Sequence, residues 1–380
     1  MMRCFFVVLL LFCEAKETIC LNMIVKNESP VIERCLDSVI PFIDYWVIVD
    51  TGSKDNTKKI IKKHLKNIPG ELHSRKWKNF GENRTEAFNL AKEKGDYILL
   101  IDADDTLEPS QGFSFPKLDQ DVYTMWRGSN GFTYLHPQLI RGNLPWRWVG
   151  VTHEYLSCGA DFTTATLDNI RYVSGDGGHR SSGIGKFLEN IRLLEEGLEQ
   201  EPENTRYAFY LAESYRDAGQ RGKALEWYQN RISRGDWPEE VFWSYLQIGH
   251  LLKDLGICSN VVIESYLNAY RYRPHRPEPI YFISEIYNSE QNYQSAYTVL
   301  QMGENIQKPE KKDMLFNMDW IEDYGLTFQK SICTYYLGKY QESLDACNAL
   351  LKNPHLPASW RKQVEENMRF PREKLEDLID

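Results

Sequence analysis

The spacing of apolar residues changes near residue 185, and this change constrains the fold more than any other feature of the sequence. Before residue 185, short apolar runs alternate with helical patterns. These runs are residues 19–25, 45–50, 96–102 and 121–126. Strands that are apolar on both faces and alternate with helices predict a mainly parallel, doubly wound sheet. After it, small and apolar residues recur at helical spacing, which predicts an all-α second domain.

Three helical patterns lie between the predicted strands. The first, residues 30–42, places Ile32 and Val39 on one apolar face. The second follows the TGSKDNT stretch at 51–57. The third, RTEAFNLAKEKG, closes on Gly95 as a helix C-cap would.

The second half contains a degenerate repeat. Small residues recur in steps of 37, 35 and 47 residues, at Ala212, Gly249, Ser284 and Ser331. Seven residues beyond each of them comes a turn position, occupied in order by Gly219, Gly256, Gln291 and Gly338. The small residues of the second helices are Ala224, Ala296 and Ser343. The pattern resembles the tetratricopeptide repeat, a helix pair of about 34 residues whose small positions let neighbouring helices approach. The longest step predicts an insertion, placed at residues 307–320.

Charged residues follow the most apolar predicted strand. Residues 97–101 run directly into Asp102, Asp104 and Asp105. Clustered carboxylates repel one another unless a cation lies among them. Oxygen ligands suit Mg²⁺ or Mn²⁺, and Mg²⁺ is usually held by one or two carboxylates together with substrate phosphates. We therefore expect a divalent ion at Asp102 and Asp104, bridging a diphosphate, with Asp105 as a cap or outer support.

Other polar residues end the neighbouring strands. Asn27 and Glu28 follow the first strand, and Asp50 ends the second. Because ligands of doubly wound sheets bind at the carboxyl ends of strands, these three residues are candidate ligand contacts.

Three blocks, LNMIVKNESPVIERCLDSV, VIVDTGSKDNT and GDYILLIDADD, resemble in order and spacing the nucleotide-sugar domain of family 2 glycosyltransferases, which have the GT-A fold. With the repeats behind it, the chain is similar to the bacterial subset that carries a tetratricopeptide array after the transferase. This resemblance implies that Asp50 contacts the nucleobase, usually uracil, that Asp102 faces the ribose or the metal, and that Asp104 of the D-x-D motif ligates the metal.

The resemblance also implies roles for residues outside the three blocks. Arg84, where the third helical pattern begins, is expected to face the diphosphate. The block RWVGVTHEYL resembles the family's acceptor-side segment, in which Glu154 is the candidate general base with His153 beside it. The block GDGGHRSSGIGK resembles a mobile loop that closes over the donor, and its His179 is a further candidate metal or phosphate contact.

Several of these residues have structural alternatives. Asp50 could cap the next helix, His153 could be a hydrogen-bonded structural histidine, and Arg84 could be a surface residue. Trp146 and Trp148 are expected in the core, with stacking on a sugar as the alternative.

The predicted function is metal-dependent transfer of a sugar from a nucleotide-diphosphate donor, expected to be a UDP-sugar, to a protein, peptide or glycan acceptor. The resemblance implies inversion at the anomeric carbon. The repeats are expected to bind the acceptor or a protein partner. One alternative is a nucleotidyltransferase on a related fold, which would need a basic, Gly-rich loop where this chain has KNESP. Another is a non-catalytic adaptor with a relic transferase domain.

The charge argues against one class of partner, and the cysteine spacing argues against a zinc site. The net charge is −9, and no dense basic block occurs beyond residues 58–64, which argues against nucleic acid as a partner. The eight cysteines are scattered without zinc-like spacing, and we expect them to behave as small buried apolar residues.

The predicted organisation is a leader at residues 1–17, a GT-A domain at 18–182 and a tetratricopeptide-repeat-like domain at 183–380. An apolar run from Cys4 to Cys13 has the length of a signal-peptide core. A real leader would make the protein exported or membrane-anchored, whereas an extra buried strand or a misplaced start would leave it cytoplasmic.

Overall fold

The computed structural model describes residues 16–129, 132–175, 177–178, 184–307, 309 and 313–377. The chain divides into two compact units. The first contains Met1–Met125, His136–Val149 and Glu154–His179, and the second contains Trp126–Leu135, Gly150–His153 and Arg180–Asp380. Most of the predicted leader lies outside the described residues, and among those that are described no helix is long and apolar enough to cross a membrane.

The first unit is built on a mixed, mainly parallel sheet. Its described strands follow the order β3-β2-β1-β4-β7-β6-β10-β5. β1 pairs in parallel with β2 and β4, and β2 pairs in parallel with β3, whereas β7 joins β4 and β10 joins β5 in antiparallel fashion. The bounds are β1 Ile19–Val25, β2 Tyr45–Asp50, β3 Gly70–Ser74, β4 Tyr97–Leu100, β5 Thr106–Pro109, β6 Val122–Ser129, β7 Phe132–Arg141 and β10 Thr164–Val173. A separate antiparallel pair is formed by β8 (Trp146–Val149) and β9 (Tyr155–Cys158).

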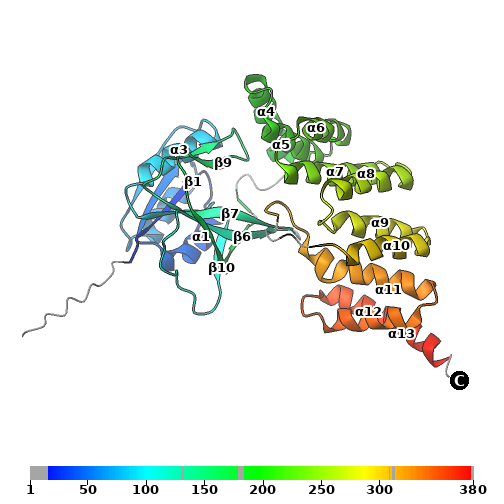
Figure 1. Cartoon of the computed structure of the whole chain (residues 1–380). Coiled ribbons are helices and arrows are strands. Elements are labelled where there is room, and N and C mark those ends of the chain that lie inside the picture. Colours follow the sequence, from blue (N-terminus) through cyan, green and yellow to red (C-terminus); the bar gives the residue numbers. More distant parts are fainter. Residues whose placement is uncertain are drawn as a thin grey trace, which may run out of the picture. The chain divides into compact units, whose positions relative to one another are not determined.

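Helices cover both faces of this sheet (Figure 1). They are α1 (Ile32–Val39), α2 (Thr57–His64) and α3 (Phe80–Ala91), and a short 3₁₀ helix, Ile40–Phe42, follows α1. Successive side chains of a strand point to opposite faces. Leu21 of β1 therefore packs with Leu36 of α1 and Ile61 of α2, whereas Cys20 packs with Phe88 of α3. This is the predicted doubly wound arrangement.

The strands β1 and β2 have the predicted bounds, but α3 does not. It begins at Phe80, where Asn79 caps the helix by accepting a hydrogen bond from the N–H of Glu82, and it ends at Ala91. The predicted start near Arg84 is therefore wrong, since Arg84 lies in the second turn of the helix. Gly95 follows the helix end by several residues and does not cap it.

The second unit is an array of helices in which neighbours along the chain pack as pairs: α5 with α6, α7 with α8, α9 with α10, and α11 with α12. The bounds are α4 Ile184–Gln200, α5 Thr205–Asp217, α6 Arg221–Arg234, α7 Pro238–Asp254, α8 Ser259–Tyr272, α9 Glu278–Ser289, α10 Tyr293–Glu304, α11 Leu326–Tyr336, α12 Tyr340–Lys352 and α13 Ala358–Glu376.

The repeat positions occupy the places that the sequence predicts. All four turn positions lie between the helices of a pair and have positive φ, namely 74° at Gly219, 70° at Gly256, 59° at Gln291 and 74° at Gly338. Such a left-handed residue commonly ends a helix. The small residues lie at helix contacts: a Cβ atom on Gly249 would collide with the ring of Tyr266 in α8. The extra residues of the longest step fall between α10 and α11, where a π-helical segment, Ile321–Gly325, precedes α11.

Candidate active site

The three polar strand ends lie at one edge of the sheet. Val25 at the end of β1 pairs with Asp50 at the end of β2, and Asn22 pairs with Leu100, two residues before Asp102. Because these strands are parallel, the residues that follow them gather at the same edge. The sequence prediction of a polar edge is thus matched by the register of β1, β2 and β4.

Asp50 holds the turn that follows β2. It is buried, and its carboxylate accepts hydrogen bonds from the N–H groups of Gly52 and Ser53 at 3.1 Å. Lys58 places its Nζ 3.7 Å from the same carboxylate. Asp50 thus fixes this turn but does not cap α2, whose N-cap residue is Asn56, and its nucleobase contact stays a prediction.

The loops after β1 and β2 are joined by hydrogen bonds. Asn27, which has a φ of 58°, donates its N–H to Ser53 Oγ at 2.9 Å and accepts from the N–H of Lys54 at 2.8 Å. Glu28 donates its N–H to Thr57 Oγ1 at 2.8 Å. Asparagine tolerates this left-handed backbone better than most residues. The two predicted ligand contacts therefore also fix the shape of the polar edge.

Arg84 joins two of the predicted site residues. Its Nη2 donates to Asp102 Oδ1 at 2.6 Å, and its Nε donates to Glu154 Oε1 at 2.5 Å. Burial disfavours the charged guanidinium, but the two carboxylates outweigh this effect and raise the pKa of Arg84 above its usual value. The surface alternative for Arg84 is wrong, because only 16% of its side chain is exposed. A cation thus lies between the strand-end carboxylate and the candidate base.

Asp104 and Asp105 differ sharply in their contacts. Asp105 is buried and accepts hydrogen bonds from the hydroxyl of Tyr172 at 2.5 Å and from the N–H of Gly175 at 2.9 Å. Asp104 is partly exposed, and its carbonyl oxygen accepts from Arg34 Nη2 at 2.7 Å. Asp105 therefore supports the loop, as expected, while the carboxylate of Asp104 stands nearer to solvent.

The glycine-rich stretch after β10 packs against this loop. A Cβ atom on Gly175 would collide with the carbonyl oxygen of Asp104, and one on Gly178 would collide with the Asp104 carboxylate. Glycine is required where two backbones approach so closely. The first residues of the predicted donor loop therefore lie beside Asp104. His179, the candidate within that loop, lies outside the described residues.

The donor set at the strand end suits a hard divalent cation. No group of three or more His, Cys, Asp or Glu side chains that could hold a metal occurs among the residues that the structure describes. Mg²⁺, however, needs only one or two protein carboxylates when substrate phosphates and water complete its shell. Asp102 and Asp104 offer two oxygen ligands of this type at the partly exposed end of β4. The residues present therefore fit the predicted ion.

His153 makes its contacts within the second unit. Its ring stacks on that of Tyr210 with centroids 4.1 Å apart and an interplanar angle of 5°. Its carbonyl oxygen accepts from Arg206 Nε at 2.9 Å, and Asn190 Nδ2 lies 3.3 Å from its Nε2. These contacts match the structural alternative for His153. Glu154, the next residue, belongs to the first unit, where it contacts Arg84.

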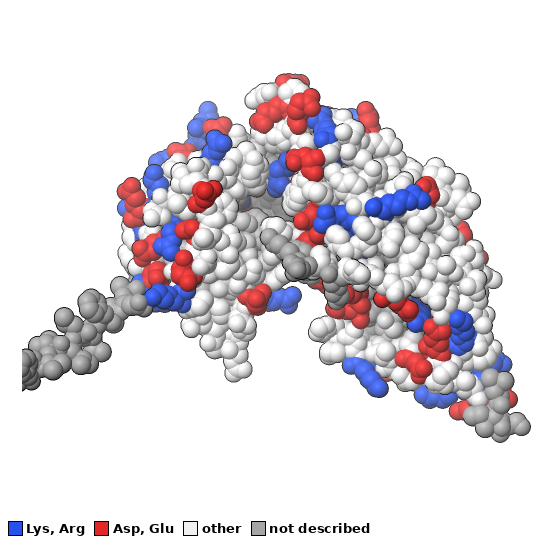
Figure 2. Space-filling view, in the orientation of Figure 1, with Lys and Arg blue, Asp and Glu red and all other residues white. Residues whose placement is uncertain are grey.

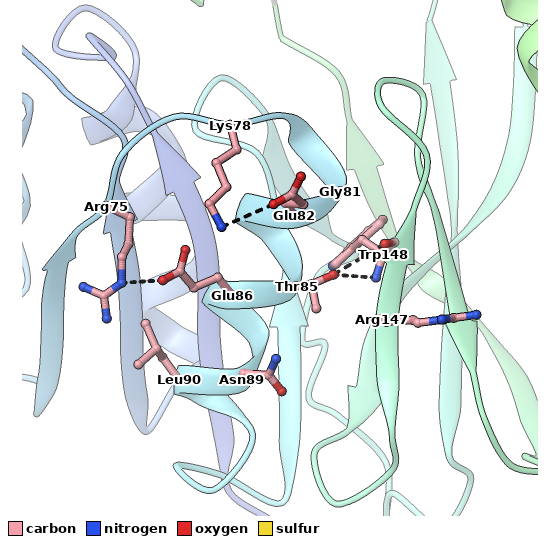
Figure 3. A pocket seen from close by; sticks show the side chains of 10 residues that line it. All are labelled: Arg75, Lys78, Gly81, Glu82, Thr85, Glu86, Asn89, Leu90, Arg147 and Trp148. Carbon is pink, nitrogen blue, oxygen red and sulfur yellow. Dashed lines mark hydrogen bonds and ion pairs between the residues drawn. The ribbon is translucent and has the colours of Figure 1, made fainter. Parts of the chain in front are cut away.

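A pocket of about 480 Å³ opens on the outer side of α3 (Figure 3). Trp148 of β8 forms part of its wall and is fixed to the helix, because its N–H donates to Thr85 Oγ1 at 2.9 Å. The lining residues are Arg75, Lys78, Gly81, Glu82, Thr85, Glu86, Asn89, Leu90, Arg147 and Trp148.

Sequence reasoning missed several residues of the site. Arg34 and Tyr172 hold the loop of Asp104 and Asp105, yet one lies in an ordinary amphipathic helix and the other in a strand. No local pattern distinguishes them from surface and core residues. The pocket beside Trp148 was not predicted; the sequence suggested only, as an alternative, that Trp148 stacks on a sugar.

Part of the first unit is similar to known glycosyltransferases. Residues 20–111 match the family model described as Glycosyl transferase family 2. The SPbeta prophage-derived glycosyltransferase SunS of Bacillus subtilis is 26% identical over 229 residues, which cover 57% of this chain and 53% of SunS. A TPR repeat-containing protein of Synechococcus elongatus is 36% identical over 93 residues, which cover 24% of this chain and 22% of that protein. The chain thus spans about half the length of SunS, and less of the second relative.

Solved structures similar to this chain include tetratricopeptide proteins. One from Parabacteroides merdae has a TM-score of 0.36 at 19% identity, covering 50% of this chain and 68% of its own. A thermophilic TPR protein of Thermus thermophilus has a TM-score of 0.34 at 12% identity, covering 49% of this chain and 92% of its own. The repeat assignment rests on the chain's own helix pairs, turn positions and small residues. The chain therefore carries a family 2 glycosyltransferase domain of the GT-A type, matched at residues 20–111, followed by a tetratricopeptide-repeat array.

Proposed function

We propose that this protein is a metal-dependent glycosyltransferase that moves a sugar from a nucleotide-diphosphate donor, in first place a UDP-sugar, to an acceptor nucleophile with inversion. The observation that carries the proposal is the position of Arg84 between Asp102 and Glu154. This cation and its two carboxylates lie where the parallel strands end, in a domain that matches family 2 glycosyltransferases. The same edge carries Asn27 and Asp50, two further residues that the resemblance or the strand ends mark as ligand contacts.

In the proposed reaction, the acceptor oxygen or other nucleophile forms a bond to the anomeric carbon of the sugar. The bond from that carbon to the diphosphate oxygen breaks, and the electron pair leaves with the nucleoside diphosphate. Glu154 accepts the acceptor proton as general base. Its side chain is 9% exposed, which limits the access of bulk water to it.

Arg84 has two roles in this scheme. In the structure described here it neutralises Asp102 and Glu154. With donor bound, its guanidinium is a suitable contact for the diphosphate, because the planar fork of arginine matches phosphate oxygens. Transfer of Arg84 from Glu154 to the diphosphate would free the base only when the donor is present.

Asp102 and Asp104 would hold Mg²⁺ or Mn²⁺. A divalent ion there would neutralise negative charge on the departing diphosphate. Asp105 contributes indirectly, because its hydrogen bonds to Tyr172 and Gly175 fix the loop that carries Asp104.

The array of helix pairs is proposed to bind a protein partner or the acceptor itself. Repeat arrays offer extended concave surfaces for such binding. On the face shown in Figure 2, basic and acidic side chains are interspersed over both units, and the net charge is −9. Neither property favours nucleic acid as the partner.

A donor-turnover assay tests the proposed function. The full chain is incubated with Mn²⁺ and each member of a panel of UDP-, GDP- and TDP-sugars, and release of the nucleoside diphosphate is measured. We expect release from one class of donor, loss of release with EDTA, and a decrease of about 10²–10³-fold in Glu154→Gln when acceptor is present. Release from none of the donors, or full activity in Glu154→Gln, would overturn the proposal.

A further inference from the structure

We infer that the pocket between α3 and β8 binds a neutral saccharide, and that this saccharide is part of the acceptor; the second statement rests on the proposed function. The pocket has a volume of about 480 Å³, within the range of about 300–1,000 Å³ that is typical of small-molecule sites. Figure 3 shows its residues along one side of α3, facing the loop after β3 and the strand β8.

The polar groups of the pocket suit hydroxyl groups. Arg75 Nε pairs with Glu86 at 2.6 Å, and Lys78 Nζ pairs with Glu82 at 3.2 Å, so donors from the loop after β3 lie beside acceptors on α3. The exposed amide of Asn89 adds one donor group and one acceptor and, within the described part of the chain, makes no side-chain hydrogen bond. A sugar hydroxyl both donates and accepts, and it can use both kinds of group.

The same groups disfavour an anionic ligand. The carboxylates of Glu82 and Glu86 line the pocket and would repel a phosphate, a sulfate or an acidic peptide. Arg75 and Lys78 are already neutralised by these two carboxylates. The donor diphosphate is therefore disfavoured as the occupant, and the inference places the acceptor there.

The apolar part of the pocket suits the C–H face of a pyranose ring. It consists of the indole of Trp148 and the side chain of Leu90, and indole rings combine a broad apolar face with a rigid frame. Thr85 holds Trp148 in place, since Oγ1 accepts from the N–H of Trp148 at 2.9 Å and donates to its carbonyl oxygen at 3.4 Å. The backbone that carries the indole ring is thus fixed to α3.

The pocket is linked to the candidate base through a single side chain. The guanidinium carbon of Arg84 lies 5.3 Å from the centroid of the Trp148 ring, and the same guanidinium binds Glu154. A sugar stacked on Trp148 would therefore occupy a subsite next to the reaction centre. We assign it to a sugar of the acceptor that does not itself react.

Direct binding to the full-length protein tests the inference. Saturation-transfer NMR is recorded with three neutral probes, maltotriose, cellotriose and triacetylchitotriose, and with inorganic phosphate as the anionic probe. We expect at least one trisaccharide to bind and phosphate not to displace it. Asn89→Ala should weaken binding roughly fivefold, as expected for one lost hydrogen bond. Trp148→Leu should weaken it about tenfold or more, because the aromatic platform is lost.

Lys92→Ala is the matched control, since Lys92 is exposed, follows α3 directly and does not line the pocket. It should bind the sugars as the wild type does. Asn89 is exposed as well, so the Asn89→Ala result stands even if Trp148→Leu folds poorly. Binding of none of the three sugars, unchanged binding in Asn89→Ala, or displacement by phosphate would overturn the inference. Release of UDP by the wild type without acceptor is measured separately. Sugar binding without donor turnover would refute the proposed transferase function but support the saccharide pocket. Donor turnover without sugar binding would support the transferase function but refute the saccharide pocket.

Discussion

Among single residues, Arg84 connects the parts of the candidate site. It gathers Asp102 and Glu154, which come from the end of β4 and the start of the β9 region. The apolar strand that runs into three aspartates made Asp102 and Asp104 predictable from sequence. The two contacts of Arg84 were not predictable, because Asp102 lies 18 residues and Glu154 lies 70 residues beyond it and no local pattern records either proximity.

Replacement of Arg84 by methionine should lower the free energy of unfolding by about 3–5 kcal/mol, the usual cost of removing one partner of a buried ion pair. The reason is that Asp102 and Glu154 would keep their charges without the cation that they share. Addition of Glu154→Gln to the same protein should recover part of this loss. Urea denaturation followed by circular dichroism measures both effects.

The matched control for this experiment is Arg75→Met. Arg75 pairs with Glu86 in a half-exposed position, and such pairs contribute at most about 1 kcal/mol. If Arg84→Met were no more destabilising than Arg75→Met, the buried cation would not organise the site.

Among the helices and strands, the fully buried elements were the ones whose bounds could be predicted from the sequence. β1 and β2 are buried on both faces, and their bounds were predicted to the residue. β3 was missed because its residues, GELHS, are only partly buried and include a glutamate and a histidine. The start of α3 was misplaced because Gly81 and Asn83 weaken the helical signal there, while the cap by Asn79 depends on one side-chain hydrogen bond. The turn positions of the repeat were predicted because glycine marks most of them directly.

Close helix packing at Gly249 gives a prediction for the array. Gly249→Ala should lower the free energy of unfolding by about 1–3 kcal/mol, because the added methyl group would collide with the fully buried ring of Tyr266. The control is Gly222→Ala in α6, where nothing lies near the added Cβ; it should be neutral or stabilise by up to about 1 kcal/mol. Equal urea midpoints for the two variants would show that Gly249 is not a packing position.

The histidine next to Gly249 makes the array sensitive to acid. Burial, followed by the nearby charges of Lys253 and Arg216, lowers the pKa of His250 to about 4, compared with about 6.5 for an unperturbed histidine. Between these values the unfolded chain binds the proton and the folded chain does not, so the free energy of unfolding increases with pH. This contribution is complete above pH about 6.5 and is lost as the pH falls towards 4.

Urea denaturation between pH 4 and pH 7 checks this sign. His250→Asn should flatten the dependence of stability on pH in that window, whatever its effect on stability at pH 7. His355→Asn, which changes an exposed histidine, should leave the dependence as it is in the wild type. A steeper dependence in His250→Asn would contradict the assignment.

For the molecule as a whole, the change of sequence period correctly predicted an α/β part followed by a helical array. The strand-like and the helical spacing of apolar residues can each be recognised within a short stretch of sequence, so the fold class of each half can be predicted separately. The division into units could not be predicted in this detail: residues 126–135, which include parts of β6 and β7, and residues 150–153, between β8 and β9, belong to the helical unit. Nothing in their composition marks this, because it depends on packing with side chains far away in the chain, such as Tyr210 with His153.

The transferase hypothesis depends on the loop that begins at Asp102, and binding of UDP in the presence of Mn²⁺ probes that loop most directly. Titration calorimetry on the full chain should show binding that requires Mn²⁺. Asp104→Asn should weaken it roughly 10- to 100-fold while the protein stays as stable as the wild type, because the carboxylate of Asp104 is partly exposed. Asp161→Asn, a change of an exposed aspartate elsewhere in the first unit, should have no effect. Binding of UDP by Asp104→Asn as tight as in the wild type, or binding that ignores Mn²⁺, would contradict the assignment of Asp102 and Asp104 to a metal and its diphosphate.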